Sequence, residues 1–457
     1  MSIDWKEIES WDRKYYLHNV FAHEEYDFTA IERVDGNYLY LANGAKLLDF
    51  QSQLISDGLG HRHPAPHRAI EEAMKRYGHV FFGFATDYRA RAAKLIIEDL
   101  LGGESSWASR VRILTSGGEA VENAIQMARL ATNRPIVLTQ AHSFHGLAQG
   151  ATRLPGYRGN LSHIESEITA DVPGYPSSTF HTIPAPEHQT DRISGELPSI
   201  SETRAIIEKL GAEHIAAVIT EPMFGAAGWM PHPDYYPQLR ALMNDYGILW
   251  IDDEVLCGCG RLGKWFGYQL SDNISPDLMT IGKALNGCSL PSGAVVVSEK
   301  VGDLIENARW WSGSTWDAHP LVCASIVGTL EFMLETDLLT QINARGQYLK
   351  AALDELAARH PSVGRIGGAG LYYAVDLVDA HGEPIIKADR DYLFTGDLSE
   401  NPNNLVSAAC AQRGVFLGGF VPNTIKCGPP YTITEQEIDL AMGAFDEALS
   451  LVEAKYH

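Results

Sequence analysis

The chain has 457 residues, which is too many for one small domain and enough for two or three lobes around a large buried core. Its hydrophobic content of 45% and charged content of 21% are ordinary for a soluble globular enzyme. The net charge of −22 argues against nucleic acid and anionic membranes as partners, because both carry negative charge themselves.

The chain shows no sign of export or membrane insertion. The N-terminal stretch MSIDWKEIESWDRK is polar and acidic, unlike a secretory signal, and no apolar run approaches 18 residues. No two cysteines have the Cys-x-x-Cys spacing of a zinc site, so we expect no metal, and we expect Cys257 and Cys259, two apart in a glycine-rich turn, to be buried or incidental thiols. We therefore predict a reduced cytoplasmic protein. The six cysteines are Cys257, Cys259, Cys288, Cys323, Cys410 and Cys427.

Strand-like and helix-like segments alternate along most of the chain. Residues 1 to about 60 hold short β-like runs, and residues 65–100 have amphipathic helical spacing. The order is then VRILT, GEAVENAIQMARLA, PIVLT, IAAVIT, YYPQLRALMNDY, ILWID, LMTIG and AVVVS. Strands separated by helices predict crossover units and a mostly parallel sheet with helices on both faces.

Three further segments complete the expected organisation. Residues 155–205 are rich in Pro, Ser, His and Gly, which predicts a long surface excursion. A long helix is expected to start near Pro320 and run past Met333, and residues 378–403 resemble a polar insertion. The expected division is 1–60 for the N-terminal segment of a small domain, 61–325 for a large domain and 326–457 for the C-terminal part of the small domain.

The stretch ILWIDDEV ends an apolar strand in carboxylates. A buried Asp253 is costly unless its carboxylate has a cationic partner. At a separation of ~4 Å and an effective dielectric constant near 20, such a pair attracts by about 4 kcal/mol, enough to keep a ring nitrogen protonated. The alternative is a solvated acidic loop, but Leu249, Trp250 and Ile251 disfavour it for Asp253. Glu254 is expected to be structural.

Lys283 follows the apolar run LMTIG, and its flanking residues indicate a tight, partly buried turn. Apolar surroundings lower the pKa of a lysine and make its amine a usable nucleophile. An exposed lysine is the plainer alternative. An Asp that holds a cationic ring nitrogen, together with a lysine that forms an imine, is the chemistry of pyridoxal 5'-phosphate (PLP).

Two further motifs fit this hypothesis. In TSGGEAVENAIQMAR, Gly117 and Gly118 follow a strand and open a helix, where free N–H groups favour phosphate. The alternative is an ordinary strand–helix turn with a serine cap. In HSFHG, Phe144 follows the next strand and could stack on a planar ring, although a core aromatic is the usual explanation.

The chain resembles the class III aminotransferases of PLP fold type I from about residue 45 to 440. The motifs in order are SGGEAVENA, FHG, EPMFGAAG, IDDEVLCGCGRLG, GKAL, GSTWDAHP and GPPYTIT. Residues 256–267 look closest to the amine–pyruvate (ω-amino acid) branch. The resemblance implies an α/β fold, with a large domain around a mostly parallel seven-stranded sheet. A smaller α+β domain is built from the N- and C-terminal segments.

The resemblance also implies roles for individual residues. Lys283 would bind PLP as a Schiff base (aldimine) and act as the catalytic base, and Asp253 would pair with the pyridinium. Val255 and Phe144 would enclose the ring, and the pair Gly117–Gly118 would bind the phosphate.

Three more residues are implied at the cofactor. Glu221 and His145 would lie beside it, and Thr315 would reach the phosphate of a neighbouring subunit. The protein would then be an obligate homodimer with shared active sites, or a dimer of dimers.

Several positions depart from the family pattern. Lys426 stands where many members have an arginine linked to carboxylate binding, and it cannot replace a bidentate arginine fork. Arg158, in PGYRG, is the candidate substitute, and a surface arginine is the alternative. The other departures are Leu256 after the DEV motif, Cys259 in the glycine turn, Ile55 in place of a pocket tryptophan, and Gly418 or Gly419 in place of a switching arginine.

The predicted function is transfer of an amino group from an amine or ω-amino acid donor to a keto acid such as pyruvate. An aminomutase, racemase, decarboxylase or phospho-lyase on the same fold is the alternative. A non-catalytic PLP-fold protein that acts by binding alone is disfavoured, because such a protein has no need of Asp253 and Lys283.

Overall fold

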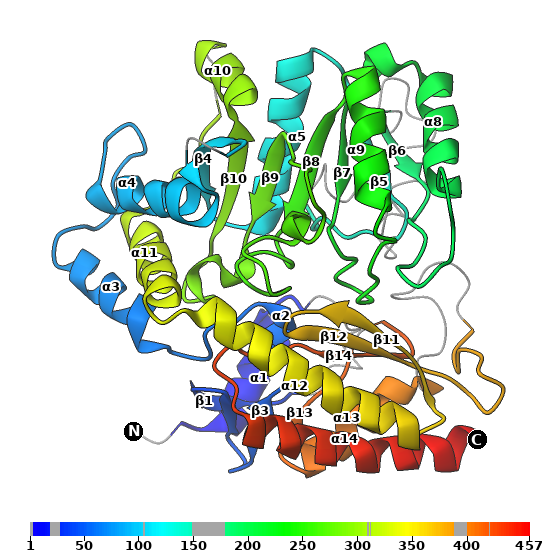
Figure 1. Cartoon of the computed structure of the whole chain (residues 1–457). Coiled ribbons are helices and arrows are strands. Elements are labelled where there is room, and N and C mark those ends of the chain that lie inside the picture. Colours follow the sequence, from blue (N-terminus) through cyan, green and yellow to red (C-terminus); the bar gives the residue numbers. More distant parts are fainter. Residues whose placement is uncertain are drawn as a thin grey trace.

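The apolar runs that alternate with helical segments form one seven-stranded sheet in the computed structural model (Figure 1). The structure describes residues 3–18, 28–103, 106–148, 179–308, 310, 312–387, 400–419 and 421–457. The strands lie in the order β4-β10-β9-β8-β7-β5-β6. They are β4 (Ala108–Leu114), β5 (Ile136–Gln140), β6 (Phe180–Ile183), β7 (Ile215–Thr220), β8 (Leu249–Glu254), β9 (Leu278–Ile281) and β10 (Gly293–Ser298).

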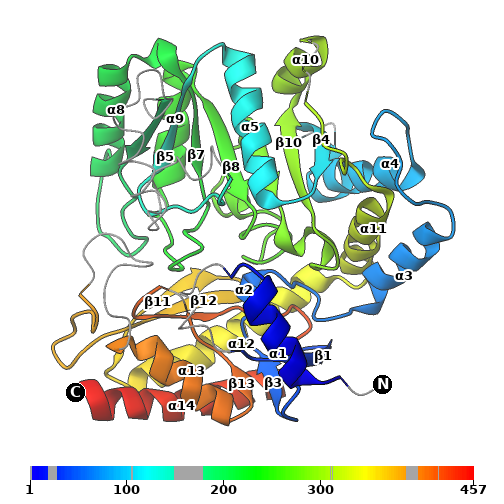
Figure 2. The same ribbon diagram turned by 180° about the vertical axis from the view of Figure 1, so that it is seen from behind.

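This sheet is parallel except for β10, which runs antiparallel to both β4 and β9. Every residue of β7 and β8 is buried, as expected for strands that helices cover on both faces. The helix α5 (Gly117–Thr132) lies on one face. The helices α8 (Pro198–Leu210) and α9 (Tyr235–Tyr246) lie on the other, as the reverse view in Figure 2 shows. The expected mostly parallel α/β large domain is confirmed.

The helix α5 illustrates why the sequence folds this way. Ser116 caps its first turn by accepting a hydrogen bond from the backbone N–H of Glu119 at 3.1 Å. Val121, Ala124 and Ala128 then recur at helical spacing and are buried against the sheet. Small side chains on this face let the helix approach the strands closely.

Segments from both ends of the chain build the small domain below this sheet (Figure 1). One of its sheets has the order β1-β2-β3-β13 and the other β11-β12-β14. The strands are β1 (Ile31–Asp35), β2 (Tyr38–Leu41), β3 (Lys46–Asp49), β11 (Val363–Ala369), β12 (Tyr372–Leu377), β13 (Val415–Phe416) and β14 (Thr424–Cys427). Because β13 pairs with β3, N- and C-terminal residues share one sheet, as predicted.

Helices connect and cover the two domains. The helix α11 begins at Pro320, as the sequence predicted, and proline suits a first helical position. The remaining helices are α1 (Trp5–Tyr15), α3 (Pro64–Met74), α4 (Asp87–Lys94), α10 (Glu299–Asn307), α11 (Pro320–Glu335), α12 (Leu338–Arg359), α13 (Pro402–Gln412) and α14 (Glu435–Tyr456). Short turns are the π-helical η1 (Leu95–Leu100) and the 3₁₀ turns η4 (Ala212–His214), η5 (Gly267–Leu270) and η6 (Lys283–Asn286). Among the described residues, every helix is too short or too polar to cross a membrane.

The element α2 (Ser52–Ile55) is a single left-handed turn. Its four residues have φ values of 40°, 50°, 64° and 61°, and none of them is glycine. Left-handed helical backbone costs roughly 1–2 kcal/mol per non-glycine residue. Tertiary contacts hold the turn: the Ser52 hydroxyl donates to the Gly428 carbonyl at 2.6 Å, and the Arg261 guanidinium donates to the Ser52 hydroxyl at 3.4 Å.

The predicted surface excursion over residues 155–205 is wrong for its described part. Residues 180–183 form β6, which pairs with β5 at the edge of the sheet, and α8 starts at Pro198. An edge strand is short and pairs on one side only, so its sequence signal is weak. The polar, proline-rich residues around β6 therefore outweighed this signal in the prediction. Of the polar insertion predicted for residues 378–403, residues 388–399 lie outside the described ranges, and α13 begins at Pro402. The division of the chain at residues 60 and 325 stays a prediction.

Candidate active site

The strands β5, β8 and β9 end at the same edge of the large sheet, which is where ligands bind in open α/β folds. Asp253 is near the end of β8 and is the register partner of Thr280 on β9. Lys283 follows β9 as the first residue of η6 and has a left-handed φ of 46°. The structure thus brings Asp253 and Lys283 to neighbouring strand ends, as the sequence predicted.

Three hydrogen bonds fix the buried carboxylate of Asp253. It accepts from the backbone N–H of Val255 at 3.1 Å and from the hydroxyl of Thr280 at 2.8 Å. Its Oδ2 lies 2.6 Å from Nδ1 of His145, whose Nε2 lies 3.1 Å from Oγ1 of Thr139. Thr139 and Thr280 were not predicted as site residues. Each is a polar residue inside an otherwise apolar strand, and this pattern could have indicated a site residue.

The neighbouring carboxyl groups of Asp252 and Glu254 point to the other face of β8 and are 0% exposed. Burial, and then the charge of Glu254, raises the pKa of Asp252 well above its usual value. Burial raises the pKa of Glu254 to about 7, and the charge of Asp253 adds to this shift, while hydrogen bonds from the backbone and from Asp252 oppose it. Glu254 accepts a hydrogen bond from the backbone N–H of Tyr268 at 2.8 Å. The alternative of a solvated acidic loop is therefore wrong for all three carboxyl groups, and Glu254 has a structural contact, as expected.

The surroundings of Lys283 favour the neutral amine. Burial lowers the pKa of Lys283, while the carboxylates of Asp253 and Glu221 oppose this effect. A Cβ atom on Gly282 would lie 3.2 Å from Cγ1 of Val255 and 3.5 Å from Cα of Gly117. The lysine turn, Val255 and the start of α5 therefore meet at one point.

The start of α5 offers an anion cradle at this point. A Cβ atom on Gly117 would lie 2.7 Å from Cγ1 of Val255, so the close approach requires glycine. A Cβ atom on Gly118 would have only Ala148 within contact distance, at 3.9 Å, so this side is open. The unpaired N–H groups and the dipole of this 16-residue helix favour a negatively charged ligand.

Glu221 and Phe144 lie on the same side of the site. The buried carboxylate of Glu221 accepts from the backbone N–H of Phe144 at 2.8 Å and from that of Gly225 at 3.1 Å. Burial raises the pKa of Glu221 to about 7; His145 opposes this shift and Asp253 adds to it. The ring of Phe144 is 39% exposed, so one face remains accessible for stacking.

An apolar cluster lies where Ile55 and Tyr372 of the small domain meet residues of the large domain. Ile55 packs in a cluster with Met223, Cys257, Leu262 and Tyr372, and the partly buried Leu256 contacts it. The positions that the family resemblance marked as unusual, Ile55 and Leu256, therefore lie together.

A single lysine adds charge to this side of the site. Lys426 on β14 is the register partner of Ala374 on β12. Burial, and then the charge of Lys283, lowers its pKa to about 8, while Glu221 opposes the shift. Among the described residues, the ammonium group of Lys426 has no hydrogen-bond or ion-pair partner.

Thr315 is not part of this cluster within one chain. It is exposed on the turn of residues 312–319, which an ion pair of 2.6 Å between Arg112 and Asp317 fastens to β4. A role toward a neighbouring subunit stays a prediction. Arg158 lies outside the described residues.

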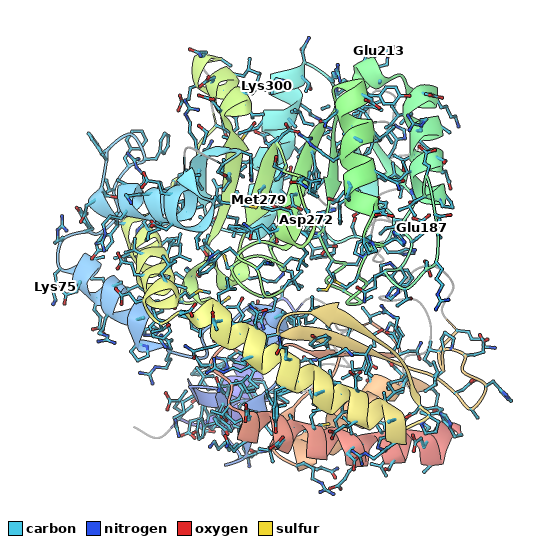
Figure 3. All side chains as sticks on the ribbon, in the orientation of Figure 1. Lys75, Glu187, Glu213, Asp272, Met279 and Lys300 are labelled. Atoms are coloured by element: carbon cyan, nitrogen blue, oxygen red, sulfur yellow. The ribbon has the colours of Figure 1, made fainter. Side chains whose placement is uncertain are left out.

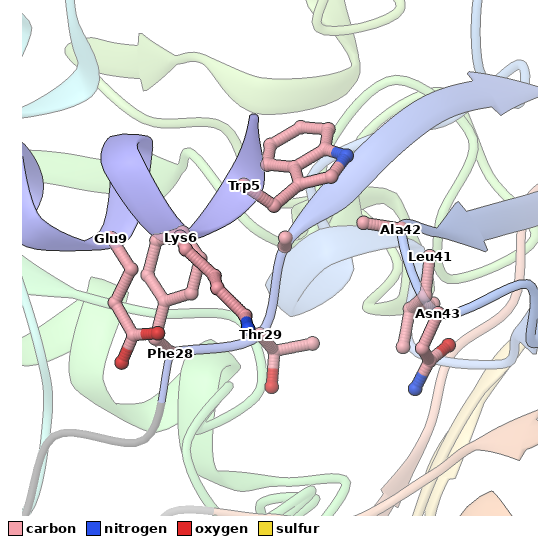
Figure 4. Close-up of a pocket in the computed structure, with 9 residues that line it drawn as sticks. Trp5, Lys6, Glu9, Phe28, Thr29, Leu41, Ala42 and Asn43 are labelled. Atoms are coloured by element: carbon pink, nitrogen blue, oxygen red, sulfur yellow. The ribbon is translucent and has the colours of Figure 1, made fainter. Parts of the chain in front are cut away.

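One pocket lies between α1, residues 28–30 and the end of β2 (Figure 4). Among the described residues that line it, Lys6 and Glu9 carry charge, and none of them is a predicted site residue. Within the described ranges, no group of three or more His, Cys, Asp or Glu side chains is arranged to hold a metal ion.

The donor set fits pyridoxal 5'-phosphate. Asp253 can pair with a protonated ring nitrogen, Lys283 can bond to an aldehyde, and the glycines at the start of α5 can receive a phosphate. The sheet order and the position of these groups at the strand ends complete the match. Fold and site together define a PLP-dependent enzyme of fold type I.

Comparisons with known proteins narrow this class. The sequence profile described as Aminotransferase class-III matches residues 20–449. The protein therefore belongs to the class III aminotransferases, the PLP-dependent transaminases that move amino groups between amines or amino acids and keto acids.

Individual relatives agree with the family. An S-selective transaminase from Arthrobacter sp. is 39% identical, has a TM-score of 0.93 and covers 100% of both chains. A structure of an S-selective transaminase from Arthrobacter sp. with alanine bound is 38% identical, has a TM-score of 0.92 and covers 99% of both chains. A taurine:2-oxoglutarate aminotransferase from Bifidobacterium kashiwanohense, in complex with PLP and glutamate, is 26% identical with a TM-score of 0.88 over 100% of both chains. A probable gamma-aminobutyrate transaminase 4 from Oryza sativa subsp. japonica is 30% identical, covering 93% of this chain and 87% of that protein.

Proposed function

We propose that this transaminase takes its amino group from a primary amine with an apolar substituent and gives it to a small keto acid such as pyruvate. The observation that carries the proposal is a contrast at the small-domain wall, which Ile55, Tyr372 and Lys426 build. Ile55 and Tyr372 pack in an apolar cluster with Met223 of the large domain, and the partly exposed Leu256 contacts this cluster, whereas the ammonium group of Lys426 has no partner among the described residues. An apolar wall suits the substituent of an amine, and one cation suits one carboxylate.

The roles of the large-domain residues follow from their geometry. When bound, PLP supplies an aldehyde and an electron-withdrawing ring. The carboxylate of Asp253, fixed by Thr280, Val255 and His145, would keep a ring nitrogen protonated. Lys283 would bond to the aldehyde, and its amine, once displaced by the donor, would take the proton from the substrate Cα atom. Burial favours the neutral amine that this step requires.

Lys426 is the proposed partner of the acceptor's carboxylate. An ammonium group is a compact point charge, so it suits a single small carboxylate better than a planar pair of contacts. The alanine bound in the Arthrobacter enzyme supports pyruvate as acceptor, because alanine is pyruvate after amino transfer. The acceptor 2-oxoglutarate carries a second carboxylate, for which the apolar surface at Ile55 and Leu256 offers no charge.

We propose that the active protein is a homodimer with shared sites. Exposed aromatic side chains lie at the turn that carries Thr315, where a Cβ atom on Gly313 would lie 2.9 Å from the ring of Phe82. The rings of Phe81 and Phe82 have centroids 4.3 Å apart, and those of Phe81 and Phe84 are 6.1 Å apart. Trp316 is exposed beside Thr315. A second copy of the chain would cover this apolar surface and bring Thr315 to its own cofactor phosphate.

A reducing compartment such as the cytoplasm is the proposed location. All six cysteines are free thiols, and burial raises the pKa of Cys257 and Cys259, which makes these two thiols less reactive.

Sedimentation of the purified protein tests the proposed homodimer. A monomer that turns over at the full rate would contradict shared sites.

A donor and acceptor panel tests the proposed reaction. The purified protein with PLP is given a phenyl-substituted primary amine, γ-aminobutyrate or taurine, with either pyruvate or 2-oxoglutarate as acceptor. The expected result is consumption of the phenyl-substituted amine with pyruvate, with formation of alanine. Faster reaction of γ-aminobutyrate or taurine with 2-oxoglutarate would contradict the proposal. Isomer formation or phosphate release without any keto acid would indicate the alternative chemistry.

A further inference from the structure

One carboxylate connects the two walls of the active site. Glu221 follows β7, and its two oxygens accept hydrogen bonds from the backbones of different segments. The N–H of Phe144, after β5, donates to Oε1 at 2.8 Å, and the N–H of Gly225 donates to Oε2 at 3.1 Å. The carboxylate is buried, so water does not compete for these contacts. Hydrogen bonds to a carboxylate are among the stronger contacts in proteins.

On the cofactor side, the contact with Phe144 fixes more than one ring. Phe144 is the predicted stacking residue, and His145 follows it directly. Nδ1 of His145 lies 2.6 Å from the carboxylate of Asp253. Glu221 therefore anchors the two-residue segment that presents both the aromatic ring and the imidazole.

On the small-domain side, the contact with Gly225 supports the turn of residues 225–228, which contacts strand β12 of the small domain. The carbonyl of Gly225 accepts a hydrogen bond from the hydroxyl of Tyr372 on β12 at 2.6 Å. A Cβ atom on Gly228 would lie 2.6 Å from Cβ of Ala374, so glycine lets β12 approach this turn. Ala374 is the register partner of Lys426, and side chains of register partners lie on the same face of a sheet.

We propose that Glu221 is a positioning residue that sets the ring of Phe144 and the ammonium group of Lys426 relative to each other. This inference rests on the proposed function in so far as Lys426 holds the acceptor's carboxylate. Glu221 need not touch either substrate. Its carboxylate acts through the backbone of Phe144 on one side and through residues 225–228, Tyr372 and Ala374 on the other.

The Glu221→Gln variant tests the proposal. Its amide oxygen can accept one N–H, but its amide nitrogen then faces the other N–H, so one contact is lost. Two results are expected: the dissociation constant of PLP rises on the order of tenfold, and the visible circular dichroism of the bound cofactor decreases. A third follows from the displaced ammonium group. The KM for pyruvate rises on the order of tenfold, while the KM for a neutral aldehyde acceptor changes less than about twofold.

A matched control is Glu187→Gln. Glu187 also accepts hydrogen bonds from a backbone N–H and a hydroxyl, both of Ser199, at 2.8 and 2.6 Å. It lies on the outer side of the large domain (Figure 3). This variant should leave the PLP dissociation constant and the KM ratio of the two acceptors unchanged, because it removes the same kind of contact elsewhere.

Two outcomes would overturn the proposal: an unchanged PLP dissociation constant in Glu221→Gln, or equal rises in KM for pyruvate and for the aldehyde. If Glu221→Gln does not fold, Glu221→Asp keeps the charge but reaches only one N–H, and the same changes in the same direction are expected. A separate measurement distinguishes failure of this proposal from failure of the proposed function. An unchanged pyruvate KM in Lys426→Met would refute the role of Lys426, while the PLP dissociation constant of Glu221→Gln would still decide whether Glu221 positions Phe144.

Discussion

The two walls of the active site are built on different principles. On the large-domain wall, three hydrogen bonds hold Asp253 and two hold Glu221. On the small-domain wall, Lys426 has no such partner among the described residues, and apolar packing surrounds Ile55. A hydrogen-bonded group loses its function when either partner changes, whereas an apolar surface tolerates changes of similar volume. Under the proposed function, the reaction depends on the large-domain wall and the choice of substrate depends on the small-domain wall.

The largest expected effect is on the large-domain wall at Lys283. In Lys283→Ala, turnover should fall by at least about 10³-fold, because the variant lacks both the amine that bonds to the aldehyde and the base that moves the Cα proton. Steady-state rates with pyruvate and the preferred amine measure this. The control is Lys300→Ala, which removes an exposed lysine on α10 (Figure 3) and should leave turnover unchanged. Normal turnover in Lys283→Ala would contradict the assigned reaction.

The next effect compares two adjacent carboxyl groups on opposite faces of β8. Asp253→Asn removes the charge that we propose holds a cationic ring nitrogen. This attraction is worth about 4 kcal/mol, so kcat should fall by about 10³-fold. Asp252→Asn should change kcat less than about twofold, since burial and Glu254 raise the pKa of Asp252 and favour its neutral carboxyl form. Rates of the two variants at neutral pH check this. Equal losses would mean that the two faces do not differ in function.

Lys426 gives the small-domain wall a positive charge that depends on pH. Because its pKa is lowered to about 8, the lysine is charged below this pH and loses its charge as the pH rises through it. The KM for pyruvate should therefore rise above about pH 8, whereas the KM for a neutral aldehyde should not. In Lys426→Met, the KM for pyruvate should rise on the order of tenfold at neutral pH and lose this pH dependence.

The same substitution should stabilise the fold. The folded pKa of Lys426 lies below the unfolded value of ~10.4, so burying its charge costs up to about 3 kcal/mol below pH 8, and the cost disappears above the unfolded pKa. Urea unfolding of Lys426→Met should show higher stability at pH 7 and little difference at pH 10.5. A lower stability at pH 7 would contradict an uncompensated charge at this position.

The sequence predicted much of the large-domain wall because strand ends carry recognisable residues. Asp253, Lys283, Phe144 and the paired glycines each follow an apolar run, and parallel strands bring such ends together. The supporting contacts were not predictable in the same way. The hydrogen bond from Thr280 to Asp253 depends on the register of β8 and β9, which a single strand sequence does not give.

The small-domain wall was less predictable because its contacts join residues far apart in the chain. Tyr372 reaches the carbonyl of Gly225 across 147 positions, and Arg261 reaches Ser52 across 209. The stretch QSQLIS contains no glycine, asparagine or aspartate, the residues that usually adopt left-handed backbone. The left-handed turn α2 therefore has no local signal, and tertiary contacts impose it.

The smallest expected effect concerns the strain in α2. Leu54 has a φ of 64° and is 50% exposed, so Leu54→Gly relieves left-handed strain and removes little packing. The gain of roughly 1–2 kcal/mol exceeds the entropic cost of glycine, roughly 0.5–1 kcal/mol, so the variant should be more stable by about 0.5–1 kcal/mol. Leu440→Gly is the matched control, because Leu440 is 46% exposed inside α14 and the same change should cost about 1 kcal/mol there. Thermal unfolding midpoints should therefore move in opposite directions, and a decrease in both would mean that the turn stores no strain at Leu54.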